Sequence, residues 1–255
     1  MNAAIVVEAG KAPIHDHFEE PVPAADEVRV TVSAAALSTV VKSRASGKHY
    51  SSSENLPFVV GIDGVGRLDD GHGVYFVLPK APFGSMSEQT VAASQCVALP
   101  DGLDDVIAAA IANPGMLAWA AFRERAKMAA GEIVLVNGAT GTTGRFALQI
   151  AKHIGAKKVI ATGRSMEALK ALKTLEADVT IPLGSTDDEF EDDSTAELML
   201  FWTISGEKAR SGLSSRAQRQ GRKSYRSVSS ISVHIGSVSS PNIAECSAYF
   251  VRQSN

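Results

Sequence analysis

Short apolar runs and one amphipathic stretch follow one another in the middle of the chain. Residues 133–136 are Ile, Val, Leu and Val, as expected of a parallel strand buried on both faces. Apolar side chains then recur four positions apart at Phe146, Ile150 and Ile154, which predicts a helix with one apolar face. A second apolar run follows at residues 159–162. The order strand, turn, helix, strand predicts a βαβ unit.

The first hundred residues have a β-type pattern instead. Residues 3–7 form a short apolar run, residues 28–32 alternate valine with polar side chains, and residues 74–78 are apolar again. Residues 43–55 are predicted to be a polar loop. Three glycines resemble a phosphate loop, but no helical pattern follows them, so they indicate relief of crowding in a curved sheet: Gly61, Gly64 and Gly66. This half therefore predicts a small β-rich barrel or sandwich.

Helical sequence joins the two halves. Residues 106–112 are alanine-rich, Asp104 can cap them, and a second helix is predicted over residues 116–129. An Asn-Pro-Gly sequence at residues 113–115 separates the two predicted helices. The break would place Asn113 in a cleft between two domains, where its amide could donate a hydrogen bond. A cap or turn role for Asn113 is an equally open interpretation.

Three glycines between the central strand and its helix have separate physical roles. Gly138 would let the chain turn off the strand, Gly141 would let the backbone approach a pyrophosphate, and Gly144 would allow close packing of helix on strand. The anion would then lie on the free N–H groups at the start of the helix. The alternative is a tight turn in another doubly wound domain. The candidate cofactor-binding residues here are Gly138, Thr140, Gly141, Thr142, Thr143 and Gly144.

The end of the second strand favours one dinucleotide over the other. NAD sites carry an acidic residue about 20 positions past the glycines, whereas a carboxylate would repel the 2′-phosphate of NADP. This chain has Thr162, Gly163, Arg164 and Ser165 at that point. The Arg164 guanidinium and the Ser165 hydroxyl could both donate to a phosphate, which predicts NADPH. In the alternative interpretation Arg164 is a solvated loop residue.

Composition and charge limit the other classes of function. The chain has 255 residues, 45% of them hydrophobic, which is enough to bury a large core. Its formal net charge of −3 is unfavourable for nucleic acid as a partner. No apolar stretch is expected to reach membrane-spanning length, and no signal peptide is recognised, so we expect a cytoplasmic protein without a membrane partner. Cys96 and Cys246 make neither a disulfide framework nor a zinc cluster.

Several motifs together resemble one known superfamily. They are the Pro-Asp-Gly-Leu turn at 100–103, Asn-Pro-Gly-Met at 113–116, VLVNGATGTTG at 134–144 and ATGRS at 161–165. Over residues 1–191 the chain resembles the medium-chain dehydrogenase/reductase superfamily, in particular its zinc-independent, quinone-oxidoreductase-like branch. The resemblance implies an α/β protein with a GroES-like catalytic domain (residues 1–115) and a Rossmann domain (residues 116–244). It also implies NADPH between the domains and a homodimer.

The chain departs from the zinc-dependent members of that superfamily. Those enzymes have a cysteine where this chain has Ser38, and a His-Glu pair where it has Ile62 and Asp63. Without thiolate or imidazole at these positions a tetrahedral zinc site is not expected. The resemblance then implies metal-free hydride transfer from NADPH to a quinone, an enone or a similar carbonyl acceptor.

Candidate catalytic residues follow from the same resemblance. It implies that Ser38 and the segment 46–50 approach the nicotinamide and the substrate. Tyr50 is one position late against the pattern, so either Tyr50 or His49 would face the cleft. Tyr50 could hydrogen-bond a reduced quinone oxygen or stack on a ring, or it could be an ordinary loop aromatic. Asn113 completes the candidate set.

The pattern is lost over residues 192–232, which are rich in Ser, Arg, Gln and Lys with little apolar periodicity. A disordered tail, a nucleic-acid or membrane arm, and a change of reading frame all fit this composition. Back-translation of residues 196–210, read two bases later, permits a strand-like apolar run, so the hypothesis is a frameshifted, truncated product with an incomplete Rossmann domain and an aberrant tail at 245–255. Intact codons in the transcript, with no alternative frame open, would contradict it.

Three functions are therefore predicted, in decreasing order. The first is an NADPH-dependent oxidoreductase of the quinone-reductase type, with activity impaired by the altered C-terminal part. The second is a non-catalytic NADPH-binding sensor protein. Such regulators carry a similar glycine turn near their N-terminus, whereas 137 residues precede Gly138 here. The third is a product without a function of its own.

Overall fold

A computed structural model describes residues 1–48, 55–93, 96–183, 200–203 and 226–229. The chain divides into two compact units, with the boundary between Asn113 and Pro114. The predictions for Tyr50, His49 and residues 245–255 lie outside the described residues, as does most of 192–232. We describe each unit separately.

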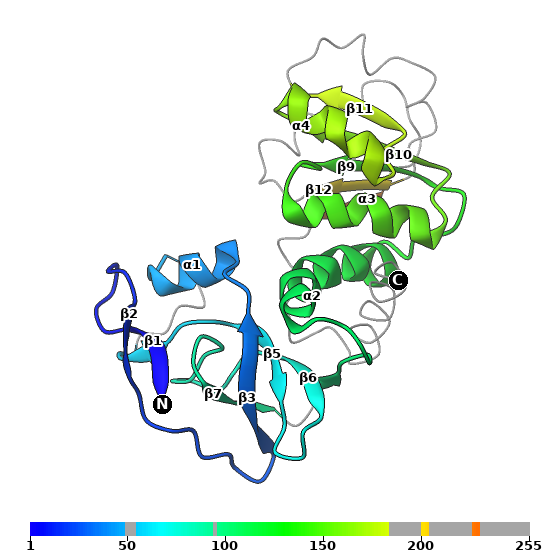
Figure 1. The fold of residues 1–255 in the computed structure, drawn as a ribbon. Coiled ribbons are helices and arrows are strands. Elements are labelled where there is room, and N and C mark those ends of the chain that lie inside the picture. Colours follow the sequence, from blue (N-terminus) through cyan, green and yellow to red (C-terminus); the bar gives the residue numbers. More distant parts are fainter. Residues whose placement is uncertain (49–54, 94–95, 184–199, 204–225, 230–255) are drawn as a thin grey trace. The chain divides into compact units, whose positions relative to one another are not determined.

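The N-terminal unit contains two antiparallel sheets (Figure 1). Strands β1 (Asn2–Val6), β2 (Ile14–His17) and β4 (Phe58–Val59) form the smaller sheet in the order β2-β1-β4. The larger sheet has the order β7-β3-β5-β6-β8 and consists of β3 (Glu27–Ala35), β5 (Asp63–Arg67), β6 (Gly73–Val77), β7 (Gln89–Ala93) and β8 (Val97–Ala98). This confirms the β-rich N-terminal half that the sequence predicts.

The glycines of β5 lie where neighbouring strands approach closely. A Cβ on Gly64 would come within 2.8 Å of the Phe76 ring, and one on Gly66 would collide with the Thr31 carbonyl oxygen. Phe76 belongs to a buried cluster with Val30 and Val74 on the same sheet. The glycines therefore relieve crowding, as the sequence pattern indicates.

The structure corrects two predictions of local structure. Thr39–Ala45 is a helix, α1, within the region predicted in part as a polar loop. Asp105–Ala120 is one continuous helix, α2, with Pro114 inside it, followed by a π-helix at Ala121–Arg125. Two helices with a break at Asn113 were predicted, and that prediction was wrong. Tertiary packing outweighs the unfavourable local sequence in both cases.

The N-terminus of α2 agrees with its prediction. The Asp104 carboxylate accepts the backbone N–H groups of Val106 at 3.0 Å and Ile107 at 2.9 Å. These bonds satisfy two of the amides that the first turn of a helix leaves unpaired. Asp104 is therefore the cap of α2.

The segment Asp105–Arg125 has 21 residues and contains an 18-residue stretch with a mean hydropathy of 1.4, of which 56% is buried. By length and composition alone it could cross a membrane, so the expectation that no apolar stretch reaches that length was wrong. The buried core helix of a soluble protein meets the same two criteria, and Trp119 and Phe122 are buried in this structure. The segment is therefore weak support for a membrane span.

The C-terminal unit is built on a parallel sheet with the strand order β11-β10-β9-β12-β13. Its strands are β9 (Ile133–Asn137), β10 (Lys158–Gly163), β11 (Val179–Pro182), β12 (Leu200–Thr203) and β13 (Arg226–Ser229). Helices α3 (Thr142–Ile154) and α4 (Met166–Ala171) lie on one face of the sheet (Figure 1). This order, with β9 central and crossovers on both sides of it, is that of a Rossmann fold and confirms the predicted fold class.

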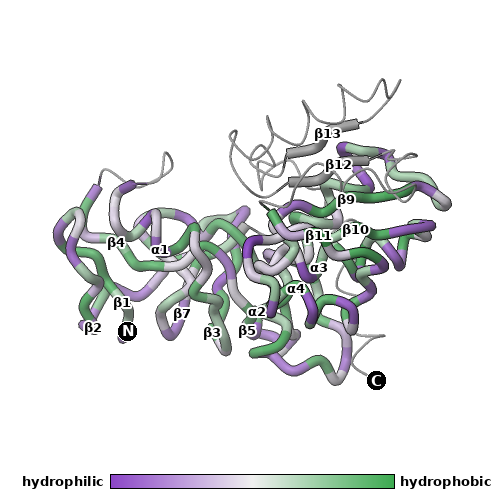
Figure 2. Tube along the Cα trace, turned by 90° about the horizontal axis from the view of Figure 1, so that it is seen from above, coloured by the Kyte–Doolittle hydropathy of each residue, from purple (hydrophilic) through white to green (hydrophobic). Residues whose placement is uncertain are grey.

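The central strands are apolar, as strands covered on both faces should be. Every residue of β9 is buried, and so is nearly all of β10, whose traces are largely hydrophobic (Figure 2). Helix α3 ends at Gly155, which has φ of +104°, a left-handed conformation that favours glycine. The predicted βαβ unit is therefore present with the predicted helix stop.

Candidate functional site

The glycine turn between β9 and α3 has the geometry of an anion cradle. Gly138 has φ of +77°, which lets the chain turn sharply at the end of β9. A Cβ on Gly144 would lie 2.6 Å from Ala139 Cα, so the start of α3 packs directly on the turn. A Cβ on Gly141 would meet only the Gly138 carbonyl oxygen, at 3.6 Å, so the outer side of the turn is open. The turn at Gly138 and the close packing at Gly144 match the roles expected of them, and the open surface at Gly141 is compatible with its expected role.

The start of α3 is suited to a negatively charged group. No side chain caps its first turn, which also carries no acidic residue. Gly141 and Thr142 are exposed and Thr143 is partly buried. The first amides of a helix lack partners within the helix, and the helix dipole favours an anion there. A pyrophosphate therefore fits this turn, while the open surface at Gly141 leaves room for it.

Sequence reasoning overlooked Arg145 as part of this turn. Its Nε donates to the Thr140 carbonyl oxygen at 3.2 Å, which ties the first turn of α3 to the loop before it. The side chain is exposed and brings a positive charge to the glycine turn. The position of Arg145 in the first turn of α3 could have indicated that its charge lies near the glycine turn.

The end of β10 lies beside the glycine turn. A Cβ on Gly163 would come within 2.8 Å of Thr140 Cγ2, and the amides of Gly138 and Ala139 both donate to the Thr162 carbonyl oxygen. The fold thus brings together the two segments of the predicted cofactor site. It also places the Thr162 hydroxyl in the interior, where it donates to Asn137 Oδ1 at 2.8 Å.

Arg164 and Ser165 directly follow β10 in the chain, and both are exposed. The Arg164 side chain is exposed, and no hydrogen bond or ion pair joins it to another described residue. Ser165 caps α4, since its hydroxyl accepts the Ala168 amide at 3.2 Å. The guanidinium is therefore available to a phosphate, while Ser165 has a structural role beside any ligand role.

The two described candidate catalytic residues, Ser38 and Asn113, have different structural settings. Ser38 is the N-cap of α1, and its Oγ accepts the Val41 amide at 3.4 Å. Asn113 is 5% exposed and lies inside α2, so neither a turn nor a cap role applies to it. Asn113 instead lies beside a buried carboxyl.

That buried carboxyl is Asp63, which sequence reasoning considered only as a missing zinc ligand. Asp63 is 1% exposed, and its Oδ2 accepts the Tyr75 hydroxyl at 3.0 Å. Burial raises the pKa of Asp63 from 3.8 to about 6, while the Tyr75 hydroxyl and the Asn113 amide partly oppose this. Asn113 Nδ2 and Asp63 Oδ1 nevertheless complete no hydrogen bond in the structure. We therefore regard burial as the dominant cause. No local sequence signal distinguishes this acid from a solvated one.

Metal ligands do not gather in the part of the chain that the structure describes, where no group of three or more His, Cys, Asp or Glu side chains could hold an ion.

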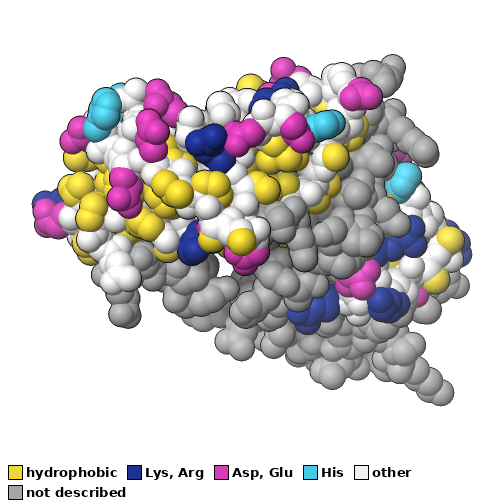
Figure 3. All heavy atoms as spheres, turned by 90° about the horizontal axis from the view of Figure 1, so that it is seen from below, with side chains coloured by type: hydrophobic (Ala, Val, Ile, Leu, Met, Phe, Trp, Pro, Cys, Tyr) yellow, Lys and Arg dark blue, Asp and Glu magenta, His cyan; other side chains and the backbone are white. Residues whose placement is uncertain are grey.

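Burial raises the pKa of the Cys96 thiol to about 11, which keeps it protonated near neutral pH. On the face of the molecule in Figure 3, acidic side chains are interspersed with hydrophobic ones.

Comparison with known proteins finds relatives that are named as reductases. The chain is 30% identical over 213 residues to a probable NADPH-dependent quinone reductase of Emericella nidulans, covering 71% of this chain and 60% of the relative. It is 36% identical over 186 residues to 2-methylene-furan-3-one reductase of Solanum lycopersicum, covering 66% of this chain and 47% of the relative. The chain thus spans about half the length of these relatives. No protein-family model matches it.

A solved structure supports the same fold. The quinone oxidoreductase of Thermus thermophilus, also solved in complex with NADPH, superimposes with a TM-score of 0.81 and 21% identity. The alignment covers 99% of this chain and 87% of that protein. At this identity the match establishes the fold.

Proposed function

This chain belongs to the medium-chain dehydrogenase/reductase superfamily, and we propose that it is an NADPH-dependent oxidoreductase that reduces a quinone, an enone or a similar carbonyl acceptor without a metal. The observation that carries the proposal is the glycine turn, with an uncapped helix N-terminus and an exposed arginine at the end of the next strand. The turn fits a pyrophosphate and the arginine fits a 2′-phosphate. The relative from Emericella nidulans is named as NADPH-dependent, in agreement with this choice of dinucleotide.

In this proposal the residues of the C-terminal unit hold the dinucleotide. The amides of Thr142 and Thr143 bind the pyrophosphate, Gly141 permits its close approach, and the Arg164 guanidinium pairs with the 2′-phosphate. When bound, NADPH supplies a hydride, and the acceptor takes up this hydride together with a proton. The protein holds the reactants in position and excludes water.

The residues proposed to act on the acceptor are Ser38, Tyr50 and Asn113. Ser38 Oγ accepts a backbone amide, which leaves its own proton free to donate to an acceptor oxygen. Tyr50 keeps its role on the resemblance alone. Asn113 is buried next to Asp63 and acts in this proposal as a positioning group. The acceptor is a small molecule, and a cytoplasmic protein without nucleic-acid or membrane partners remains the expected state. A homodimer is what the resemblance alone implies.

Titration with NADPH and NADH tests the cofactor half of the proposal. Nicotinamide fluorescence and thermal shift should both show saturable binding with NADPH preferred. Arg164→Ala should weaken NADPH binding by about 10- to 100-fold, the value of one charge-assisted contact, and leave NADH binding unchanged. Lys170→Ala is a matched control, because Lys170 is an exposed cation on the neighbouring helix α4.

Two outcomes would contradict the cofactor half of the proposal. Equal loss of NADPH and NADH affinity in Arg164→Ala would mean that the guanidinium does not read the 2′-phosphate. A folded protein that binds neither dinucleotide would remove the cofactor site. Saturable NADPH binding without turnover on quinones and enones would instead support the sensor alternative.

A further inference from the structure

The N-terminal unit contains a cavity of about 430 Å³ beside α1. Its walls are mostly apolar and include Val41 and Ala45 of α1, Val60 and Met86. Val41, Ala45 and Val60 are each less than a tenth exposed, so this part of the wall belongs to the packed interior. Pockets that hold small molecules typically have volumes of roughly 300–1,000 Å³ and apolar linings with few polar groups. The cavity therefore has the size and lining of a small-molecule site.

Two lysines supply the charge of this cavity. Lys11 comes from the loop between β1 and β2, Lys42 comes from α1, and both are exposed. Neither ammonium forms an ion pair with a described residue. Glu8 is the acid in the same loop, and its contact with Lys11 joins backbone atoms, at 3.2 Å. The lysines thus present positive charge beside apolar walls, which complements an apolar molecule with an anionic group.

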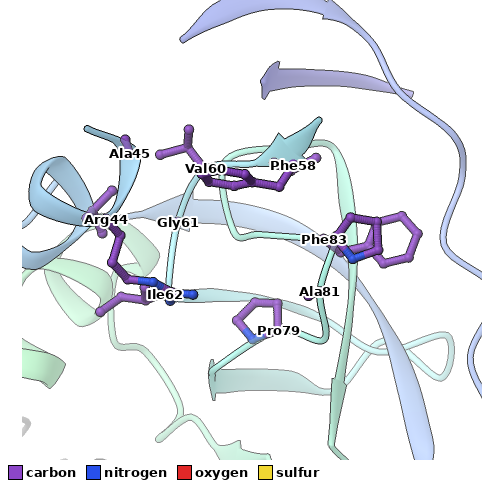
Figure 4. Close-up of a pocket in the computed structure, with 12 residues that line it drawn as sticks. Arg44, Ala45, Phe58, Val60, Gly61, Ile62, Pro79, Ala81 and Phe83 are labelled. Atoms are coloured by element: carbon purple, nitrogen blue, oxygen red, sulfur yellow. The ribbon is translucent and has the colours of Figure 1, made fainter. Parts of the chain in front are cut away.

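A second hollow borders the same helix but is too small for such a ligand. It has a volume of about 40 Å³, shares Val41, Ala45 and Val60 with the cavity, and is also lined by Arg44. Figure 4 shows Arg44 reaching past Ile62 in this hollow. Burial lowers the pKa of Arg44. The hollow has room for a few water molecules only, on the order of one per 10–15 Å³.

The position of the cavity connects it with the proposed reaction. Leu37, which precedes the candidate catalytic residue Ser38, lines the cavity and is 60% exposed. We propose that the cavity receives the apolar body of the electron acceptor and that Lys11 and Lys42 select acceptors with an anionic group. The role as acceptor site rests on the proposed function. The ligand chemistry rests on the cavity alone.

Binding of decanoate to the full chain without NADPH tests the ligand chemistry. Isothermal titration calorimetry should give saturable binding, with decanol weaker and acetate not bound. Each lysine should contribute up to about fivefold, the usual value of an exposed ion pair. Lys11→Gln and Lys42→Gln should therefore each weaken decanoate binding about two- to fivefold and leave decanol binding unchanged. Lys48→Gln, an exposed lysine outside the cavity lining, should change neither.

A variant with a filled cavity tests whether decanoate binds in the cavity. Ala12 is an exposed loop residue in the lining, so Ala12→Trp should reduce decanoate and decanol binding alike without disturbing the core. Undiminished binding in Ala12→Trp, or equal affinity for decanoate and decanol, would overturn the inference. NADPH titration of the same samples separates the two proposals. NADPH binding without decanoate binding overturns this inference alone, whereas decanoate binding without NADPH binding overturns the acceptor role and the proposed function.

Discussion

Replacement of Asp63 by asparagine should remove a pH-dependent penalty from the stability of the N-terminal unit. Burial raises the pKa of Asp63 from 3.8 to about 6 in the folded protein. An acid with a raised folded pKa is favourable below its unfolded pKa and loses this contribution as the pH rises towards the folded pKa. The shift corresponds to about 3 kcal/mol of lost stability at pH 7, most of it between pH 4 and pH 6.

The asparagine variant keeps an oxygen that can accept the Tyr75 hydroxyl and carries no charge. Its stability relative to the wild type should therefore rise by about 2–3 kcal/mol between pH 4 and pH 7. Hydrogen bonds lower the pKa values of Glu27, Asp70 and Glu88. The folded protein therefore loses the stabilising contribution of these three carboxylates as the pH falls. These groups are present in both proteins, so they cancel in the difference.

The assay is urea unfolding at pH 4 to 7.5, followed by hydrogen exchange of β5 and β6 with mass spectrometry, because these strands carry Asp63 and Tyr75. Asp101→Asn, on an exposed turn, is the matched control and should show no comparable gain. A stability difference for Asp63→Asn that stays constant across this pH range would refute the reasoning, since the buried carboxyl would then not carry a raised pKa.

Four other substitutions test the remaining sites. Gly144→Ala should cost about 1–3 kcal/mol because the new Cβ meets the backbone of the turn, whereas Gly141→Ala should fold normally and bind NADPH more weakly. Equal thermal stability of the two variants would contradict this. Tyr75→Phe should destabilise the protein by about 1–3 kcal/mol at pH 7 by leaving Asp63 Oδ2 without its donor, measured by urea unfolding against Asp63→Asn. Ser38→Ala should cost about 1 kcal/mol through loss of the α1 cap, and a drop in turnover beyond this loss of folded protein would indicate a catalytic role.

The sequence predicted best those elements whose signals are local and repeated. The apolar run of β9, the four-residue spacing along α3 and the stop at Gly155 each depend on neighbours in the chain, and the structure has all three. The short helix α1 was missed because it begins Thr-Val-Val, a run with low helix propensity. Its Ser38 cap and its packing through Val41 are visible only in the fold.

The candidate site shows the same limit. The glycine turn and Arg164 could be predicted because backbone conformation and exposed charge follow from residue type. The pairing of Asp63 with Tyr75 joins strands β5 and β6, and the raised pKa of Asp63 comes from burial. Burial is a property of the whole unit, so a single sequence gives little indication of it.

These observations bear on the proposal of a metal-free reaction. The superfamily's zinc-dependent members use a thiolate and an imidazole where this chain has Ser38 and Ile62. Here the Ser38 oxygen accepts a backbone amide of α1, and Ile62 is 2% exposed in the apolar interior. The acid beside it, Asp63, accepts the Tyr75 hydroxyl. A hydroxyl and an alkyl group are poor zinc ligands, and one oxygen of Asp63 is already occupied by the Tyr75 hydroxyl. The donor chemistry of these positions therefore favours hydride transfer that depends on positioning of the reactants rather than on a metal.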